Sequence, residues 1–267
     1  MAHKEPPAAL NLKRMNVSRA PEGITSGDRG WEQRTDPSQA QFQNDLDLFE
    51  IDLRSIEKTG IRRSVDTALK RLVDIVLSAT ALVVGAPLFL GVWIAIQLSS
   101  PGPAIFRHRR IGAGGVYFDC YKFRTMVQNA DELLEEVLSV HPDLREEYAL
   151  THKLKEDPRV TRIGCILRKT SLDEFPQFWN VLKGDMSIVG PRPIVTAEVE
   201  RYGHWLPLIL ELRPGITGLW QVSGRNDTTY AERIALDRRY ALTRNILTDF
   251  SIMLKTPSVM IKRNGAY

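Results

Sequence analysis

The longest apolar run in the chain extends from Ile75 to Leu98, about 24 residues without a charge, and only Ser78, Thr80 and Gln97 interrupt it. At 1.5 Å per residue, a straight helix of this length would cross a hydrocarbon core of about 30 Å. A core helix of a soluble protein would carry polar residues along one face, which this run does not. We therefore expect the segment to enter a membrane.

Pro87 lies in the middle of this run, where its ring and its missing N–H favour a kink or a break. Basic residues lie on both sides, whereas a single-pass helix is positive mainly on its cytoplasmic side. They are Arg62, Arg63, Lys70 and Arg71 before the run, and Arg107, Arg109 and Arg110 after it. A helix that turns near Pro87 and leaves by the same face explains both observations. We predict such a re-entrant membrane helix over residues 61–102, with a spanning helix as the alternative.

The segments on either side of the membrane run differ in character. Residues 1–60 are rich in Pro, Gly, Ser and charge, which predicts a disordered or loosely docked tail. After the run, Ala104–Ile111 and Val116–Lys122 are short apolar and basic segments joined by Gly112-Ala113-Gly114-Gly115, the pattern of a β-hairpin.

Later elements are short and separated by turns that contain Gly, Pro and Arg. Asn129 or Asp131 is a candidate cap for a helix closed by Pro142, and Asp227 for a helix through Ile234 to Leu242. Residues 247–261 are apolar enough to lie against membrane or core. We predict an α+β fold that is mostly helical: a monotopic membrane protein with a proline-broken re-entrant helix, a small β-hairpin, and a cytoplasmic globular domain of short helices and loops over residues 103–267.

Composition narrows the class of partner. The chain has 267 residues, 43% of them hydrophobic, and a net charge of +4. Residues 1–60 hold 8 Lys and Arg against 10 Asp and Glu, so the basic excess belongs to the later part and indicates an anionic partner, which could be nucleic acid, a phospholipid surface or a nucleotide phosphate. Cys120 and Cys165 show no metal-ligand spacing and suit a reducing compartment. No signal peptide is evident, so the working part is expected to face the cytoplasm.

The candidate reaction centre is the pair Asp173-Glu174, directly behind Arg168 and Lys169. Two carboxylates beside cations can hold a divalent metal, and one of them can attack phosphorus. Ser171-x-x-Glu174 is also a capping box, a purely structural interpretation of the same residues. The two interpretations are compatible, because a helix N-terminus favours an ionised carboxylate and binds phosphate.

Cations near turns surround this pair in sequence. Guanidinium groups and backbone N–H groups in turns bind phosphate oxygens with fixed geometry, although any one arginine could equally form a surface ion pair. The candidates are Lys122, Arg124, Arg159, Arg168, Arg192 and Arg225.

Several ordered motifs together resemble the monotopic bacterial sugar transferases, the polyprenyl-phosphate hexose-1-phosphate phosphotransferases, over roughly residues 70–267. The chain looks most similar to the short exopolysaccharide-initiating galactosyl and glucosyl phosphotransferases. One departure is Ala86-Pro87, where the family usually has Ser-Pro at the membrane break. The motifs are Lys122–Met126, Asp157–Thr161, Arg168–Gln177, Asn180–Ser187, Val189–Pro193 and Arg213–Gly218 with Gln221–Arg225.

The resemblance implies a reaction and a set of site residues. Asp173 would attack the β-phosphate of a UDP-hexose, UMP would leave, and undecaprenyl phosphate would take the phosphosugar from the Asp; Glu174, with Asp173, would hold Mg²⁺. Lys122, Glu198 and Asp237 match positions important to the family. Candidates for nucleotide or acceptor phosphate contacts are Arg124, Arg159, Arg168, Arg192, Gln221 and Arg225.

The expected setting is the cytoplasmic face of a bacterial inner membrane, with membrane lipid as a neighbour and no nucleic acid. Two other functions stay open. One is a membrane-tethered glycosyltransferase that moves only the sugar and releases UDP, and the other is a non-catalytic basic module bound to anionic lipid or nucleic acid. The sequence leaves open the hexose, the prenyl chain length, and whether the protein forms a homo-oligomer.

Overall fold

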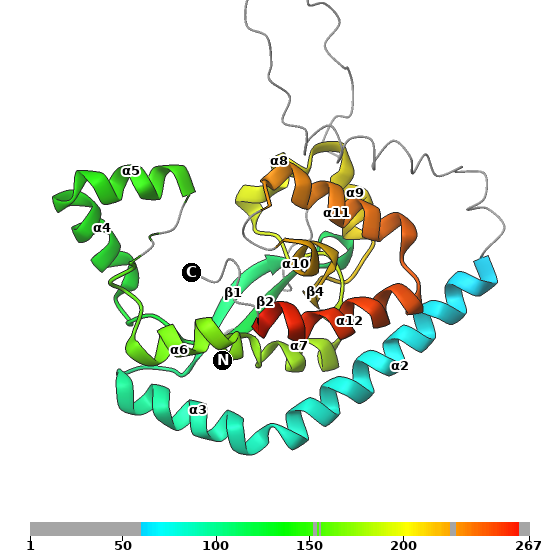
Figure 1. Ribbon diagram of the computed structural model, residues 1–267, viewed down its shortest axis with the longest axis horizontal. Coiled ribbons are helices and arrows are strands. Elements are labelled where there is room, and N and C mark those ends of the chain that lie inside the picture. Colours follow the sequence, from blue (N-terminus) through cyan, green and yellow to red (C-terminus); the bar gives the residue numbers. More distant parts are fainter. Residues whose placement is uncertain (1–59, 152–153, 155, 225–227, 262–267) are drawn as a thin grey trace, which may run out of the picture.

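The computed structural model describes residues 60–151, 154, 156–224 and 228–261, and the expected tail over 1–60 lies almost wholly outside them. Within these residues the chain is mostly helical, with two small two-stranded sheets, as the α+β prediction requires. Figure 1 shows α2 and α3 as two arms below a body of short helices, while α4 and α5 stand apart at one side. The helices are α2 (Gly60–Val84), α3 (Ala86–Ser99), α4 (Ala130–Val140), α5 (Pro142–Thr151), α6 (Arg162–Thr170), α7 (Gln177–Lys183), α8 (Val199–Tyr202), α9 (Leu206–Leu210), α10 (Leu219–Ser223), α11 (Tyr230–Thr243) and α12 (Ile246–Ile261).

The break predicted at Pro87 is confirmed. No single helix within the described ranges is long and apolar enough to cross a membrane, whereas α2 from Asp66 and α3 together meet that length and composition, with a bend of 60° between them. Gly85 forms the junction, and Pro87 occupies the first turn of α3, where its missing N–H costs no helical hydrogen bond. Insertion of this bent pair into a membrane stays a prediction.

The β-hairpin is also confirmed. Strand β1 (Ile105–Ile111) pairs antiparallel with β2 (Tyr117–Phe123), so that Phe106 lies opposite Lys122 and Arg110 opposite Phe118. Gly114 and Gly115 have φ angles of 67° and 75°, a left-handed backbone that glycine adopts without steric cost. Because side chains alternate between the faces of a strand, His108, Arg110 and Lys122 share one face of the hairpin.

A second, parallel pair of strands closes the centre of the body. Strand β3 (Ser187–Val189) lies beside β4 (Gly215–Thr217), and a Cβ on Gly190 would come within 2.4 Å of the Arg213 carbonyl oxygen. Gly190, the first residue of the Gly-Pro-Arg-Pro turn, is therefore needed because its lack of a side chain lets the backbone come close to Arg213.

Polar side chains of α2 anchor this helix to the body. Lys70 Nζ donates to the Val189 carbonyl at 2.9 Å and to Asp249 Oδ2 at 2.7 Å. Arg71 donates to the carbonyls of Val181 and Leu182 at the end of α7. The expectation that Lys70 and Arg71 serve as basic flanks of a membrane run therefore omits their main contacts, which dock α2 onto the body.

Two helix starts differ from the sequence-based expectation. Helix α11 begins at Tyr230 behind a capping box formed by Thr229 and Glu232, whereas the expected cap, Asp227, lies outside the described residues. Asn129 is the N-cap residue of α4, but its side chain makes no capping hydrogen bond, and Pro142 opens α5 as well as following α4.

The inner face of α3 shares a hydrophobic cluster with the hairpin and with α6. The cluster has Ile96, Ala104, Phe123 and Leu167 at its centre, with Phe89, Val92, Ile105, Ile163, Leu172 and Phe175 packed around it. Leu172 and Phe175 immediately flank Asp173-Glu174. Their packing holds the acidic turn between the bent helix and the hairpin.

Candidate active site

Asp173 and Glu174 lie on a 3₁₀ turn (Leu172–Glu174) between α6 and α7, so the α-helix itself begins only at Gln177. The capping box expected from Ser171 and Glu174 does not form. Ser171 instead ends α6 in a left-handed conformation, with φ 57°, and its side chain makes no cap hydrogen bond. The Glu174 carboxylate is thereby released from a capping role and turns to Lys122.

Lys122, from strand β2, joins the two carboxylates. Its Nζ lies 2.6 Å from Glu174 Oε1, a charge-assisted hydrogen bond, and 3.8 Å from Asp173 Oδ2. The side chain of Asp173 is 14% exposed and that of Glu174 35%. The structure thus brings together three of the residues predicted for the reaction centre.

Burial raises the pKa of Asp173 to about 6; Glu174 adds to the rise, while Lys122 and, less strongly, Arg168 oppose it. The helix N-terminus expected to favour the ionised carboxylate is absent here, because α7 begins only at Gln177. The cations lower the pKa of Asp173 as expected, but loss of hydration outweighs them. At neutral pH the group is still mainly ionised, as a nucleophile must be.

Arg168 borders the acidic turn from α6. Its Nε donates to Thr125 Oγ1 at 3.0 Å, and its charge interacts with both Asp157 and Asp173. A Cβ on Gly164 would come within 1.9 Å of the Thr125 carbonyl oxygen, so the absence of a side chain lets α6 approach the end of the hairpin. This contact sets the position of Arg168 beside the turn.

Asn180, on α7, fixes the distance between the acidic turn and the hairpin. Its Oδ1 accepts from the Tyr121 N–H at 2.9 Å, and its Nδ2 donates to the Asp119 carbonyl at 2.7 Å. The residue is fully buried. Asn180 belongs to a motif for which the sequence indicates no role, because a clamp between distant segments has no local signal.

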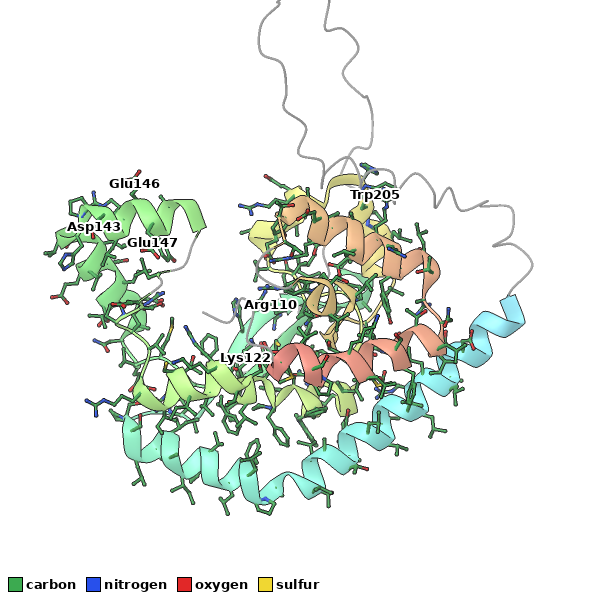
Figure 2. All side chains as sticks on the ribbon, in the orientation of Figure 1. Arg110, Lys122, Asp143, Glu146, Glu147 and Trp205 are labelled. Atoms are coloured by element: carbon green, nitrogen blue, oxygen red, sulfur yellow. The ribbon has the colours of Figure 1, made fainter. Side chains whose placement is uncertain are left out.

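A second cluster of predicted residues lies around Arg110, on the same face of the hairpin as Lys122. Arg110 NH1 donates to the Pro193 carbonyl at 3.0 Å and lies 4.0 Å from Glu198 Oε2. The same Glu198 oxygen accepts from the Val195 N–H at 3.0 Å. Figure 2 shows Arg110 and Lys122 near the middle of the molecule. Both are far from Asp143, Glu146 and Glu147, which lie on α5.

Asp237 and Arg192 belong to this second cluster. Burial raises the pKa of Asp237 to about 7, opposed by a hydrogen bond from Tyr202 and by the charges of Arg233 and Arg192. The guanidinium carbons of Arg192 and Arg233 lie 5.8 and 4.4 Å from the ring centre of Trp220, within cation–π range.

His108 lies between the rows of Lys122 and Arg110 on the same face of the hairpin. Its pKa is lowered to about 4, mainly by burial and also by the cations Arg110, Lys122 and Arg192. His108 is therefore neutral at physiological pH, and its ring adds no positive charge to a face that already carries Arg110 and Lys122. His108, Arg110, Trp220 and Arg233 were not predicted as members of this region. Only the alternation along β1 could have placed Arg110 on the same face of the hairpin as Lys122.

Three predicted binding residues have other contacts. Arg124 donates from both terminal nitrogens to the Ser100 and Pro101 carbonyls behind α3, and Arg159 forms a bidentate pair with Asp157 at 2.7 and 2.8 Å. Gln221 donates to the Ile216 carbonyl at 2.8 Å. A substrate contact by any of these residues stays a prediction, and Arg225 lies outside the described residues.

The acidic turn offers two neighbouring carboxylates to a metal ion. Among the described residues no group of three or more His, Cys, Asp or Glu side chains could hold an ion. Mg²⁺ needs fewer protein ligands, because it commonly binds one or two carboxylates together with substrate phosphates and water. Asp173 and Glu174 fit that requirement if Glu174 exchanges Lys122 for the ion.

Comparison with known proteins identifies the family. The family model for bacterial sugar transferases matches residues 65–263. The chain belongs to this family, as its motifs predict.

Three similar proteins have curated names. The chain is 47% identical over 218 residues to an undecaprenyl-phosphate galactose phosphotransferase of Salmonella typhimurium, a match that covers 82% of this chain and 45% of that protein. It is 46% identical to the exopolysaccharide production protein ExoY of Rhizobium meliloti, over 79% of this chain and 93% of that protein. It is 41% identical to a UDP-glucose:undecaprenyl-phosphate glucose-1-phosphate transferase of Caulobacter vibrioides, over 74% of this chain and 72% of that protein. The chain thus spans less than half of the Salmonella protein but nearly all of ExoY, and these names support the expected phosphoglycosyl transferase class.

Proposed function

We propose that the protein transfers hexose-1-phosphate from a UDP-hexose to undecaprenyl phosphate and releases UMP, as the first membrane step of exopolysaccharide synthesis. The observation that carries this proposal is the placement of Lys122 between Asp173 and Glu174, at 3.8 and 2.6 Å, on a turn packed against the bent helix pair. The names of the similar proteins support the same reaction class.

The first step forms a bond between a carboxylate oxygen of Asp173 and the β-phosphorus. The bond from that phosphorus to the bridging oxygen breaks, and the electron pair leaves with UMP. Asp173 is suited to this role because it is mostly buried yet ionised at neutral pH. A poorly hydrated carboxylate is a stronger nucleophile than one in bulk water.

The second step uses an oxygen of undecaprenyl phosphate to attack the same phosphorus. The bond to Asp173 breaks, the carboxylate is regenerated, and the product is a lipid diphosphate sugar. Arg168 and Lys122 stabilise the charge on the phosphoryl oxygens in both steps. Mg²⁺ bound at Glu174 and Asp173 would neutralise the diphosphate charge.

Arg110, Arg192 and Glu198 form a second polar region, and Arg110 shares one face of the hairpin with Lys122. We assign this region to the remaining phosphate or nucleotide part of the donor. The Asp237 carboxylate interacts with the charges of Arg192 and Arg233 in this region.

The reaction is tested with the full chain in a detergent that lacks phosphate, incubated with Mg²⁺ and a panel of UDP-hexoses. Without acceptor, wild-type protein should gain the mass of one hexosyl phosphoryl group (hexose phosphate less one water) and release one equivalent of UMP. Asp173→Asn should gain no mass, whereas Glu135→Gln, an exposed carboxylate on α4, should behave as wild type. Release of UDP would establish the glycosyltransferase alternative, and full turnover by Asp173→Asn would exclude the covalent step.

A further inference from the structure

A short joint connects the two halves of the candidate site. Helix α7 follows the acidic turn that carries Asp173, and strand β3 leads into the Gly190–Pro193 turn that carries Arg192. Residues 184–186 alone separate the helix from the strand, and Gly184 ends the helix with a left-handed φ of 91°. The angle at this joint therefore decides how far the proposed nucleophile lies from the arginine assigned to the donor.

Helix α2 contacts the helix side of the joint. Arg71 donates from NH1 and NH2 to the carbonyls of Val181 and Leu182, at 2.6 and 2.9 Å. These carbonyls lie in the last turn of α7, so the guanidinium caps the C-terminal end of that helix. A Cβ on Gly184 would lie 3.4 Å from Arg71 NH2, so the guanidinium also lies beside the joint itself.

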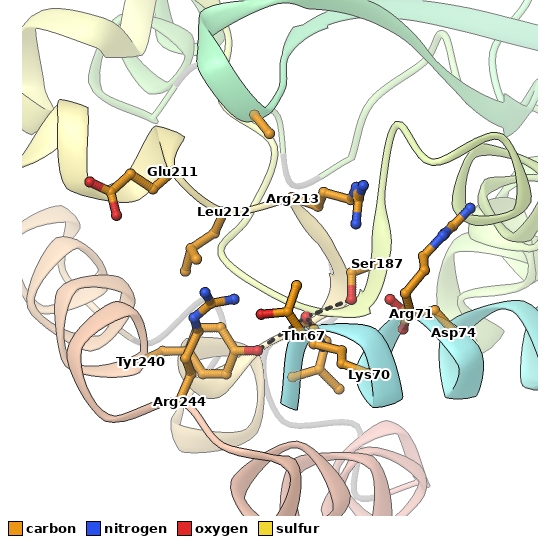
Figure 3. Close-up of a pocket in the computed structure, with 12 residues that line it drawn as sticks. Thr67, Lys70, Arg71, Asp74, Ser187, Glu211, Leu212, Arg213, Tyr240 and Arg244 are labelled. Atoms are coloured by element: carbon orange, nitrogen blue, oxygen red, sulfur yellow. Dashed lines mark hydrogen bonds between the residues drawn. The ribbon is translucent and has the colours of Figure 1, made fainter. Parts of the chain in front are cut away.

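The same helix contacts the strand side of the joint. Asp74 Oδ1 accepts from the Ile188 N–H at 3.0 Å, and Lys70 Nζ donates to the Val189 carbonyl at 2.9 Å. Lys70 and Asp74 are four residues apart and lie on one face of α2. Figure 3 shows both side chains on α2, next to Ser187 at the start of β3. Helix α2 thus binds two successive residues of the strand.

The strand-side contacts belong to a buried polar network. Asp249 accepts from both Lys70 and Tyr240, so the Lys70 ammonium is held between this carboxylate and the Val189 carbonyl. Asp249 and Asp74 are each 3% exposed. A buried network whose members are hydrogen-bonded to one another permits few other arrangements. Helix α2 therefore fixes the position of β3 as well as covering it.

A small change at the joint would be amplified at the nucleophile. Asp173 lies 11 positions before Gly184 along a helical path, which at about 1.5 Å per residue is roughly 16 Å. A rotation of about 5° at the joint would therefore move Asp173 by about 1.4 Å. A misplacement of about 1 Å can slow a transfer about 100-fold, because the reacting atoms must be aligned.

We propose, on the basis of the function proposed above, that Lys70, Arg71 and Asp74 are positioning residues for the transfer reaction. Through them α2 bridges the joint and fixes Asp173 relative to Arg192. The three side chains act through backbone groups of α7 and β3 and not on the substrate itself. The first half of α2 thereby sets the geometry in which the donor phosphate meets the nucleophile, a role separate from the predicted membrane insertion.

The test removes the strand-side contact with Asp74→Ala and the helix-side contact with Arg71→Met. The matched control is Ser78→Ala, one turn further along the same face of α2, where the buried hydroxyl has no hydrogen-bond partner. Asp74→Asn is the conservative variant, since its amide oxygen can still accept from the Ile188 N–H.

The full chain in detergent is mixed with Mg²⁺ and a UDP-hexose without acceptor, at a temperature at which thermal unfolding shows every variant folded. Single-turnover release of UMP is followed over a range of donor concentrations. The maximal rate should fall about ten-fold in Asp74→Ala and in Arg71→Met, while the donor concentration at half-maximal rate changes less than about two-fold. Ser78→Ala and Asp74→Asn should stay near wild type.

The double variant of Arg71→Met with Asp74→Ala gives a further test. Because one contact alone cannot fix the angle, the double variant should be about as slow as the slower single variant, whereas independent losses would multiply. If Asp74→Ala does not fold, the comparison of Arg71→Met with Ser78→Ala decides in the same way.

Two different failures can be told apart. Equal rates for Asp74→Ala and Ser78→Ala, or multiplied losses in the double variant, would overturn the positioning role even though release of UMP by wild type upholds the proposed reaction. If wild type releases no UMP from any of the UDP-hexoses, the proposed function fails and the positioning role fails with it.

Discussion

Gly85, at the bend between α2 and α3, lies directly against the ring of Phe175, the residue that follows the acidic pair. A Cβ on Gly85 would come within 2.4 Å of Phe175 Cζ and 2.6 Å of the Ala81 carbonyl oxygen. Phe175 also packs in the cluster that joins α3 to the hairpin. The bend between α2 and α3 and the candidate active site are therefore in direct contact, and the position of one constrains the other.

A methyl group at Gly85 should disturb both the bend and the site. We expect Gly85→Ala to lower the free energy of unfolding by about 1–3 kcal/mol, the usual cost of overpacking, and to reduce turnover because Phe175 is displaced. Gly91→Ala is the control, since a Cβ there meets nothing within 4 Å. Phe175→Leu in the Gly85→Ala background should recover part of the loss, and strict additivity of the two changes would show that the contact is unimportant.

Removal of the Lys122 charge should shift the acidic limb of the pH–rate profile. Activity should rise with pH as Asp173 ionises, with a midpoint near its pKa of about 6. Lys122 is the strongest influence that lowers this pKa, so Lys122→Met should move the limb to higher pH. A variant with lower activity but an unmoved limb would show that the limb does not report Asp173.

The raised pKa of Asp173 also has a consequence for stability. The folded protein holds the proton of Asp173 more tightly than the unfolded chain does. Ionisation of Asp173 therefore lowers the free energy of unfolding as pH rises from about 4 to about 6, and this loss is largest above pH 6. We expect Asp173→Asn to be more stable than wild type at pH 7, by about 2–3 kcal/mol, with the difference vanishing below pH 4. Denaturant unfolding at both pH values measures this, and a difference independent of pH would contradict the burial argument.

Local signals in the sequence predict local features well. The break at Pro87 follows from the geometry of proline, and the hairpin follows from Gly112 to Gly115 between two apolar and basic segments. The acidic pair and Lys122 were both predicted as site residues, although Lys122 and Glu174 are 52 positions apart in the sequence. The motifs, and not the spacing, linked them.

Features that depend on long-range packing could not be predicted in the same way. Ser171 has a left-handed backbone at a position where glycine would be expected, so its capping-box pattern was misleading. Arg71 and Lys70 have a composition typical of a membrane flank, and only the fold shows that they contact α7 and Asp249. A buried clamp such as Asn180 is equally invisible until its two distant partners are known.

Loss of the Asn180 clamp should affect catalysis as well as stability. Asn180→Ala leaves the Tyr121 N–H and the Asp119 carbonyl buried without this partner, at a cost of about 1–3 kcal/mol for each group. Because α7 would then shift relative to β2, Lys122 and the acidic turn should separate and kcat should fall more than KM rises. Asn129→Ala, where the side chain makes no capping bond, is the control for loss of an Asn. An unchanged kcat in a folded Asn180→Ala protein would argue against a positioning role.

The pair formed by Lys70 and Asp249 should be the strongest single tie between α2 and the body. Asp249 is 3% exposed and also accepts a hydrogen bond from Tyr240 at 2.6 Å, so Lys70→Met would leave a buried carboxylate without its cation. We expect a loss of about 3–5 kcal/mol, measured by denaturant unfolding in detergent. Lys255→Met, an exposed lysine on the same helix α12, should change stability by less than about 0.5 kcal/mol. Replacing both partners, Lys70→Met with Asp249→Leu, removes the unpaired charge and should recover much of the loss, because the cost comes from the isolated carboxylate and not from the absence of the pair.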